Sequence, residues 1–352
     1  MTNENKNIIY LDRNENQYGP APECFKILEN TDVSVLSEYS RDYTRGVKSC
    51  LTERLANEFN INEKSIILGF GGEDILKQAV HCYIHKGDKI MIPSHSWWYY
   101  KKIADEVSGV KVEYPIVEGK DSFNYDIDGM LKVYQEHKPK LVLISSPNNP
   151  TGNRLEIEQM KMVLSKMRDT VVVIDEAYTL FYNKDHSHLK EIIEEFPNVL
   201  IIRTFSKYYG LAGVRIGFAM MGKNHEQFSL FSARYLGFNR LSERIAIAAL
   251  DSKEYYEGMC KKMNADMDMF FTEFNKLPGF KAYRSFANFI LVKIPSEIKE
   301  SLNKYLTERN MIVKFVAEDG LFSHIRITIG TQEQNAMLMN MVKAFLRDNP
   351  AK

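Results

Sequence analysis

Residues 141–178, LVLISSPNNPTGNRLEIEQMKMVLSKMRDTVVVIDEAY, contain the pattern that decides the fold. Two short apolar runs, LVLI at 141–144 and VVVI at 171–174, stand on either side of a helical stretch at 156–167. Strands that are apolar throughout and alternate with helices are typical of a mostly parallel sheet that is covered on both faces. The segment therefore predicts an α/β fold.

The same alternation extends in both directions along the chain. Further strand-like runs are SIILGF at 65–70, KIMIP at 89–93, KVEYPIV at 111–117, VLIIRTF at 199–205 and RIGFAMM at 215–221, and helices are expected at 47–59 and 73–84. A helix-rich region follows from about 225 to 275, and then strands at 287–294 and 324–330 alternate with helices at 297–309 and 331–346. We therefore expect an N-terminal arm over residues 1–40, a large α/β domain over 41–235 and a small C-terminal α+β domain over 236–352.

Composition argues against several classes of protein, because the 352 residues include 46 Lys and Arg against 46 Asp and Glu. This balance argues against nucleic acid or an anionic membrane surface as the main partner. No apolar run approaches the roughly 18 residues of a membrane span, and the N-terminus lacks the apolar core of a signal peptide. The four cysteines are scattered, as expected for reduced thiols in a cytoplasmic protein. His81 and His85 lie one helical turn apart, but no third ligand clusters with them, so no metal site is predicted.

Polar residues follow the strands of the predicted sheet, which is where ligands bind in open α/β folds. Asp175 directly follows VVVI, and a carboxylate at the end of a buried strand is costly without a positive partner. Lys207 follows VLIIRTF and Ser206, and a lysine desolvated there can act as an amine nucleophile. Taken alone, the carboxylate could instead cap a helix or join an ion pair, and the lysine could lie on the surface. For Arg203 a structural ion pair is the expectation.

Two turns join this set. Gly71 and Gly72 follow SIILGF and precede a helix, whose free N–H groups suit a phosphate. The turn PNNPTG at 147–152 offers the amide side chain of Asn149. Each turn alone is also compatible with an ordinary strand-to-helix connection. Together, the polar residues suit a phosphorylated, aromatic, carbonyl-bearing ligand with a basic ring nitrogen.

These motifs resemble, in order and spacing, those of fold-type I enzymes that depend on pyridoxal 5′-phosphate (PLP). More narrowly, the chain is similar to class I/II aminotransferases of the histidinol-phosphate aminotransferase kind. The resemblance covers nearly the whole chain and rests on LDRNENQYGP, GFGGED, SSPNNPTG, VIDEAY, RTFSKYYGLAGVRIGF and HIRITIG. It implies a mostly parallel seven-stranded sheet flanked by helices, with a smaller α+β C-terminal domain.

The resemblance also implies roles for the residues of the cofactor site. Lys207 would form a Schiff base with PLP and later carry the proton at the substrate α-carbon. Asp175 would pair with the protonated pyridine nitrogen, and Tyr178 and Asn149 would hydrogen-bond the phenolic oxygen. The phosphate would be held by Gly72, Glu73, Ser206 and Arg215. Trp97 would stack on the ring. Tyr39 matches a tyrosine that reaches the phosphate of the other subunit, which implies a homodimer with shared active sites.

Substrate residues match the family less closely. Arg326 matches the arginine that grips the substrate's anionic group, and Tyr18 and Asn149 would also line the substrate site. Lys314 stands where a second arginine is usual in the family, and a lysine would attract an anion without the bidentate contact that an arginine makes. The segments 94–100 and 233–243 also depart from the family pattern. In the aromatic run 97–100, the residues other than Trp97 are expected to pack in the core.

The resemblance therefore implies a PLP-dependent aminotransferase that moves an amino group from a small-molecule donor to an oxo acceptor, with a phosphorylated substrate as one option. The alternative is a PLP-dependent decarboxylase of a phosphorylated amino acid, since the bond held perpendicular to the ring is the one that breaks. A PLP-binding regulator is a third reading, which the retained Lys207 and the balanced charge disfavour.

Overall fold

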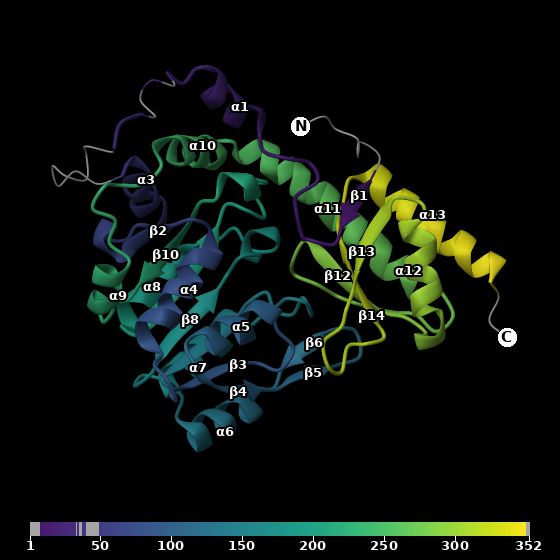
Figure 1. The fold of residues 1–352 in the computed structure, drawn as a ribbon, viewed down its shortest axis with the longest axis horizontal. Coiled ribbons are helices and arrows are strands. Elements are labelled where there is room, and N and C mark those ends of the chain that lie inside the picture. The colour runs from purple at the N-terminus through teal and green to yellow at the C-terminus, as the bar shows by residue number, and fades with distance from the viewer. Residues whose placement is uncertain (1–7, 33, 35–36, 40–48, 350–352) are drawn as a thin grey trace.

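A seven-stranded sheet forms the centre of the larger half of the molecule in the computed structural model, which describes residues 8–32, 34, 37–39 and 49–349 (Figure 1). Its strands, in spatial order, are β2 (Ile66–Gly69), β10 (Gly217–Met221), β9 (Val199–Thr204), β8 (Val171–Asp175), β7 (Leu141–Ser145), β3 (Lys89–Pro93) and β4 (Val110–Tyr114). All neighbouring pairs are parallel except those of β10, which runs antiparallel to β2 and β9. The mostly parallel seven-stranded sheet is thus confirmed.

Both faces of this sheet are buried, as the continuous apolar runs predict. Side chains alternate between two hydrophobic clusters, so that Ile144 and Ile174 pack on one side while Leu143 and Val173 pack on the other. One side is covered by α3 (Cys50–Phe59), α6 (Ile127–His137), α7 (Ile157–Lys166) and α8 (Ser187–Glu195), and the other by α4 (Gly72–Tyr83), α5 (Trp98–Glu106) and α9 (Glu226–Phe231). The first residues of the helix expected at 47–59 lie outside the described residues.

A second sheet of five strands forms the smaller half (Figure 1). Its order is β1 (Ile9–Leu11), β13 (Met311–Phe315), β14 (His324–Thr328), β12 (Phe289–Lys293) and β11 (Lys281–Tyr283). The helices α12 (Lys299–Thr307) and α13 (Gln332–Asp348) lie at the positions expected for them, and α1 (Pro22–Glu29), α10 (Arg240–Asp251) and α11 (Lys253–Phe274) complete the set of described α-helices. Among the helices that the structure describes, none combines the length and the hydrophobicity that a bilayer crossing requires.

Three short strands were not predicted, and a fourth is the end of a longer run that was predicted as one strand. The N-terminal arm contributes β1, which pairs in parallel with β13, and β11 lies at the far edge of the same sheet. The run KVEYPIV divides into β4 and β5 (Ile116–Glu118), and β5 pairs with β6 (Phe123–Tyr125) in a separate two-stranded sheet. Each of these four strands has only three residues, which is too short for a hydrophobic period to show.

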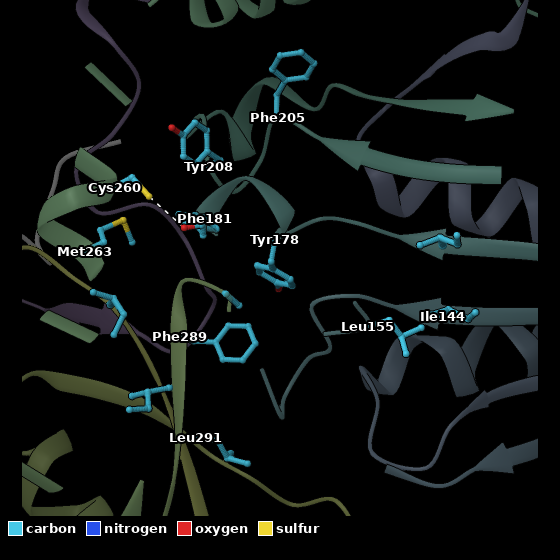
Figure 2. Close-up of a cluster of buried hydrophobic side chains, with 14 of the residues drawn as sticks. Ile144, Leu155, Tyr178, Phe181, Phe205, Tyr208, Cys260, Met263, Phe289 and Leu291 are labelled. Atoms are coloured by element: carbon cyan, nitrogen blue, oxygen red, sulfur yellow. Dashed lines mark hydrogen bonds between the residues drawn. The ribbon is translucent and has the colours of Figure 1, made fainter. Parts of the chain in front are cut away.

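One hydrophobic core joins the two halves. Figure 2 shows Tyr178, which follows β8, next to Phe289 of β12, and Phe181 beside Cys260 of α11, and all four belong to the same hydrophobic cluster. The rings of Tyr178 and Phe289 meet edge to face with centroids 5.2 Å apart. The arm adds polar contacts, because the Asn14 N–H donates to Thr328 Oγ1 at 2.9 Å. The polar ends of the first sheet are therefore held against the second sheet.

Candidate active site

A cavity of about 420 Å³ lies where the carboxyl ends of β7, β8 and β9 face the second sheet. The large half lines it with the residues that follow these strands and with the start of α4 and α5. The small half contributes residues of β13 and β14 and of the turn between them, and the arm contributes residues 12–15. Three parts of the chain that are distant in sequence therefore build one site.

Lys207 and Asp175 both line this cavity. Burial, assisted by the charge of Arg326, lowers the pKa of the Lys207 amine to about 8, and its Nζ donates to the carbonyl of Arg13 at 3.0 Å. Burial raises the pKa of Asp175, while donors from Tyr100 Oη at 2.7 Å and the Ala177 N–H at 3.0 Å act in the opposite direction. The cavity thus holds an amine that loses its proton easily and an oriented carboxyl group.

Tyr178 and Asn149 also line the cavity, as predicted for partners of a ring oxygen. The Tyr178 hydroxyl accepts a hydrogen bond from Asn14 Nδ2 at 2.9 Å, and burial raises the pKa of Tyr178 to about 12. Asn149 Oδ1 accepts from Arg326 Nη1 at 2.5 Å. Tyr178 therefore keeps its phenolic proton near neutral pH and can donate it.

The start of α4 forms a cradle with Arg215. Gly71, the residue before this twelve-residue helix, has a φ of +88° and provides no side-chain cap. A Cβ placed there would lie 2.8 Å from Arg215 Nη2, so only glycine allows the guanidinium to lie against the turn. Gly72, Glu73, Ser206 and Arg215 all line the cavity. Uncapped helical N–H groups beside an arginine suit a phosphate.

Aromatic side chains form one wall. Trp97 precedes α5 and lines the cavity together with Trp98 and Tyr100. The ring centroid of Trp97 lies 4.8 Å from that of Tyr99, which packs in the core. The expectation that the other residues of this run pack in the core is confirmed for Tyr99 and Tyr100, and Tyr100 is also hydrogen-bonded to Asp175. It is wrong for Trp98, which is 54% exposed because it faces the cavity rather than the core.

The opposite side of the cavity carries two cations. Lys314 of β13 and Arg326 of β14 are direct cross-strand partners, so their side chains share one face of the antiparallel pair. Burial lowers the pKa of Arg326, and its Nη2 donates to the carbonyl of Asp12. Lys314 is exposed and lines the same cavity. This pair of cations suits an anionic group of a substrate.

Two predicted site residues do not line the cavity of the described chain. Tyr18 packs near α11, where its carbonyl accepts from Tyr255 Oη at 2.9 Å and Lys262 Nζ lies 5.8 Å from its ring centroid. Tyr39 is 70% exposed, and its carbonyl accepts from Arg240 Nη2 at 3.0 Å. The roles of both tyrosines stay predictions, and that of Tyr39 depends on a second copy of the chain.

The sequence predicted no role in the site for several residues that line the cavity: Asp12, Arg13, Asn14, Glu15, Trp98, Tyr100 and Glu318. The motif LDRNENQYGP pointed to the arm as a whole, but only the pairing of β1 with β13 brings residues 12–15 to the cavity. Glu318 lies in a turn whose sequence carries no motif. A direct signal was therefore absent for Glu318.

Arg203 forms the expected ion pair. Its Nε and Nη2 lie 2.8 and 2.7 Å from Glu176 Oε2, and both residues are buried. Its Nη1 lies 3.1 Å from Nδ1 of His186, whose pKa burial lowers to about 3, so the neutral ring accepts this hydrogen bond. The pair joins β9 to the residue after Asp175, directly beside the cavity.

These residues fit PLP. The buried Asp175 carboxyl would be stabilised by a ring N–H donor, and the lowered pKa of Lys207 suits a covalent link to an aldehyde. The free N–H groups at the start of α4, together with Arg215, suit the phosphate. Among the described residues, no group of three or more His, Cys, Asp or Glu side chains could hold a metal ion.

Comparison with known proteins agrees with this chemistry. The family model of aminotransferase class I and II matches residues 6–342. A histidinol-phosphate aminotransferase of Ruminiclostridium cellulolyticum is 31% identical over 343 residues, which cover 96% of this chain and 92% of that protein.

Solved structures share the fold. The histidinol-phosphate aminotransferase of Sinorhizobium meliloti in complex with pyridoxal-5′-phosphate has a TM-score of 0.84 at 22% identity, covering 96% of this chain and 90% of that one. L-threonine-O-3-phosphate decarboxylase of Porphyromonas gingivalis has a TM-score of 0.79 at 21% identity, covering 97% and 100%.

Proposed function

Because this chain belongs to the class I and II aminotransferases, we propose that its substrate is a phosphorylated amine, as the names of its relatives say of theirs. The chain is a PLP-dependent aminotransferase that moves an amino group between an amino acid and an oxo acceptor. The observation that supports a phosphorylated substrate is the cross-strand pair Lys314 and Arg326, which gives the cavity two cations on one face. Two cations match a dianion better than a single carboxylate.

The proposed roles follow from the geometry. Lys207 would hold PLP covalently, Asp175 would accept from its ring N–H, and Tyr178 and Asn149 would contact its phenolic oxygen. Trp97 would stack on the ring, and the phosphate would lie against Gly72, Glu73, Ser206 and Arg215. When bound, PLP supplies an electron sink next to the substrate's α-carbon.

Lys207 would then move the proton. Its amine has a pKa near 8, so close to neutral pH it can both take and return a proton at the α-carbon. Tyr100 and the Ala177 N–H orient the Asp175 carboxylate. Tyr178 keeps its phenolic proton near neutral pH and would donate a hydrogen bond to the phenolic oxygen of PLP. Arg326, fixed by Asn149 and the Asp12 carbonyl, would orient the substrate's anionic group.

The test is to mix the PLP-loaded enzyme with histidinol phosphate and with unphosphorylated histidinol. We expect conversion of the cofactor to its amine form, with a KM at least about tenfold lower for the phosphorylated amine. Arg326→Ala should raise that KM strongly while cofactor affinity is kept. Equal KM values for the two amines would contradict a phosphorylated substrate.

Decarboxylation stays the alternative reaction. Lys314 and Arg326 would serve a distal phosphate equally well, and a threonine-phosphate decarboxylase shares the fold. Transamination ranks first because the curated relative at 31% identity is an aminotransferase. Release of CO₂ from a phosphorylated amino acid, without formation of the cofactor's amine form, would support the alternative.

We also propose a homodimer in which Tyr39 completes the partner's phosphate site. Apolar side chains are exposed next to the phosphate cradle, including Phe70, Tyr235 and Leu236, which are 46%, 82% and 53% exposed. Phe70 belongs to the cradle itself, because its carbonyl accepts from Arg215 Nη2 at 3.1 Å. A second copy that covers this surface would bring its own residues close to the cofactor phosphate.

The remaining proposals concern organisation and location. We propose the domain boundaries 1–40, 41–235 and 236–352, supported by the grouping of β11 to β14 with α12 and α13 around the second sheet. We propose a cytoplasmic location on the grounds of the four free cysteines, three of which are buried.

A further inference from the structure

The substrate side of the cavity contains a carboxylate near its cations. Glu318 lies in the turn between β13 and β14 and lines the cavity together with Lys314 and Arg326. The turn is braced, because Lys299 Nζ donates to the carbonyls of Val316 at 3.2 Å and Phe322 at 2.6 Å. Glu318 is therefore held at the cavity by the fold rather than by a partner of its own side chain.

Oε2 of Glu318 is shielded from solvent and has no hydrogen-bond partner among the residues that the structure describes. Burial raises the pKa of this carboxyl group, although the charges of Arg326, Lys314 and Lys101 oppose the shift. Asp12 repeats the pattern, because it lines the same cavity and its buried Oδ1 also lacks a partner. Buried acceptors without donors are costly, so both carboxylates favour a ligand that donates.

The charge pattern limits what that ligand can be. An anionic group can occupy the donors of Lys314 and Arg326, but it cannot satisfy Glu318 or Asp12, which repel it. A group with an N–H donor satisfies these carboxylates and is not repelled by them. A substrate that fits the whole cavity therefore carries an anionic group and, beside it, a hydrogen-bond donor, and a cationic N–H group is the donor that a carboxylate binds most strongly.

We propose that Glu318 selects the substrate's side chain by accepting a hydrogen bond from an N–H donor, such as an imidazole, ammonium or amide group, while Lys314 and Arg326 hold the anionic group. This inference rests on the proposed function, because it concerns the substrate of the same site. It makes Glu318 a specificity-determining residue, and the Asp12 carboxylate contributes a second acceptor.

The experiment uses matched pairs of amines that differ in the donor. Histidinol phosphate is compared with phenylalaninol phosphate, and L-histidine with L-phenylalanine, so that the test does not depend on which anion is preferred. Values of kcat/KM are measured for the wild-type holoenzyme, for Glu318→Gln and for the control Asp319→Asn. The control removes the charge of the next residue, whose side chain is exposed and does not line the cavity. Calorimetry with PLP-loaded Lys207→Ala, with and without Glu318→Gln, gives the same comparison without turnover.

We expect the wild type to favour the imidazole member of a pair, and Glu318→Gln to reduce that preference by about tenfold, because the amide oxygen of Gln is still an acceptor but gives up the charge-assisted part of the hydrogen bond. The phenyl member should change by less than about twofold in Glu318→Gln, and Asp319→Asn should change neither member. An equal change for both members of a pair would overturn the proposal, since Glu318 would then only offset the neighbouring cations. An unchanged preference would overturn it as well.

Failure of the proposed function gives a different result. In that case no amine converts the cofactor to its amine form, while the calorimetric preference for the imidazole member and its loss in Glu318→Gln are still measured.

Discussion

Burial gives Lys207, Asp175 and Tyr100 their chemistry. An ordinary lysine has a pKa near 10.5, whereas burial lowers that of Lys207 to about 8 and so makes the neutral amine available close to physiological pH. Tyr100 was expected only to pack in the core, and it does pack there, yet its hydroxyl also donates to Asp175. An aromatic run predicts burial, but it does not show which hydroxyl will meet a carboxylate.

Lys207 yields a prediction about pH. The rate at which the apoenzyme captures PLP covalently should rise with pH and level off with a midpoint near 8, because only the neutral amine is a nucleophile. The sign follows from a depressed lysine pKa, since the amine is protonated below the midpoint and neutral above it. Stopped-flow absorbance measures the rate.

Arg326 provides the control for that midpoint. After burial, its charge is the largest contribution that lowers the pKa of Lys207. Arg326→Met should therefore move the midpoint to higher pH, and Arg326→Lys, which keeps the charge, should leave it close to the wild-type value. A midpoint that stays near 10.5 in the wild type would contradict the assignment.

The buried pair of Arg203 and Glu176 yields a prediction about stability. Arg203→Met should lower the free energy of unfolding by about 3 kcal/mol or more, because it leaves the Glu176 carboxylate buried without a cation. The double variant Arg203→Met with Glu176→Gln should recover part of that loss, since no uncompensated charge remains. Urea unfolding of the holoenzyme measures each value. A double variant that loses more free energy of unfolding than the two single variants together would contradict this explanation.

At the level of elements, the sequence predicts the long apolar strands but not the strands of only three residues. The strands β3, β7, β8 and β9 are continuous apolar runs, so their number, direction and burial were predictable. The three-residue strands β1, β5, β6 and β11 are too short to show a hydrophobic period, and β1 pairs with a strand that is distant in sequence. Most residues proposed for the cofactor follow the long strands and were therefore predictable, whereas Glu318, which lies in a turn between two strands of the other sheet, was not.

The start of α4 yields a prediction about the phosphate. Gly71→Ala should weaken PLP binding by about tenfold or more, because its Cβ would displace the Arg215 guanidinium, 2.8 Å away. With a φ of +88° and a ψ of 169°, Gly71 lies in a backbone region that essentially only glycine adopts, so alanine there also adds strain of about 1–3 kcal/mol. Titration of the apoenzyme with PLP measures the affinity.

Gly87→Ala is the matched control. Gly87 has a φ of +87°, but nothing lies within 4 Å of a Cβ placed there. Both variants place alanine at a positive φ and should therefore lose stability in thermal unfolding, but only Gly71→Ala should lose affinity for PLP. Equal affinity in both would show that the cradle does not hold the phosphate.

At the scale of the whole molecule, the cavity depends on three separate segments. The first sheet supplies Lys207 and Asp175, the second supplies Lys314 and Arg326, and the arm closes the site only because β1 pairs with β13. The exposed apolar surface beside the cradle leaves room for a fourth segment, from a second copy of the chain. If the site is shared between two copies, two variants with different defects should restore activity in a mixed dimer, which a site built from one chain would not allow.

The wild-type protein should have a solution mass of twice 40.8 kDa by light scattering. Lys207→Ala should be inactive, and Tyr39→Phe should lose most of its turnover when PLP is limiting, because its partner's phosphate loses a donor. In a co-refolded mixture of the two variants, a mixed dimer has one site with both Lys207 and a partner's Tyr39. If half of the dimers are mixed and one of their two sites is intact, turnover should recover to about a quarter of the wild-type value. A mixture that shows only the average of the two separate variants would mean that Tyr39 serves its own chain or no site at all.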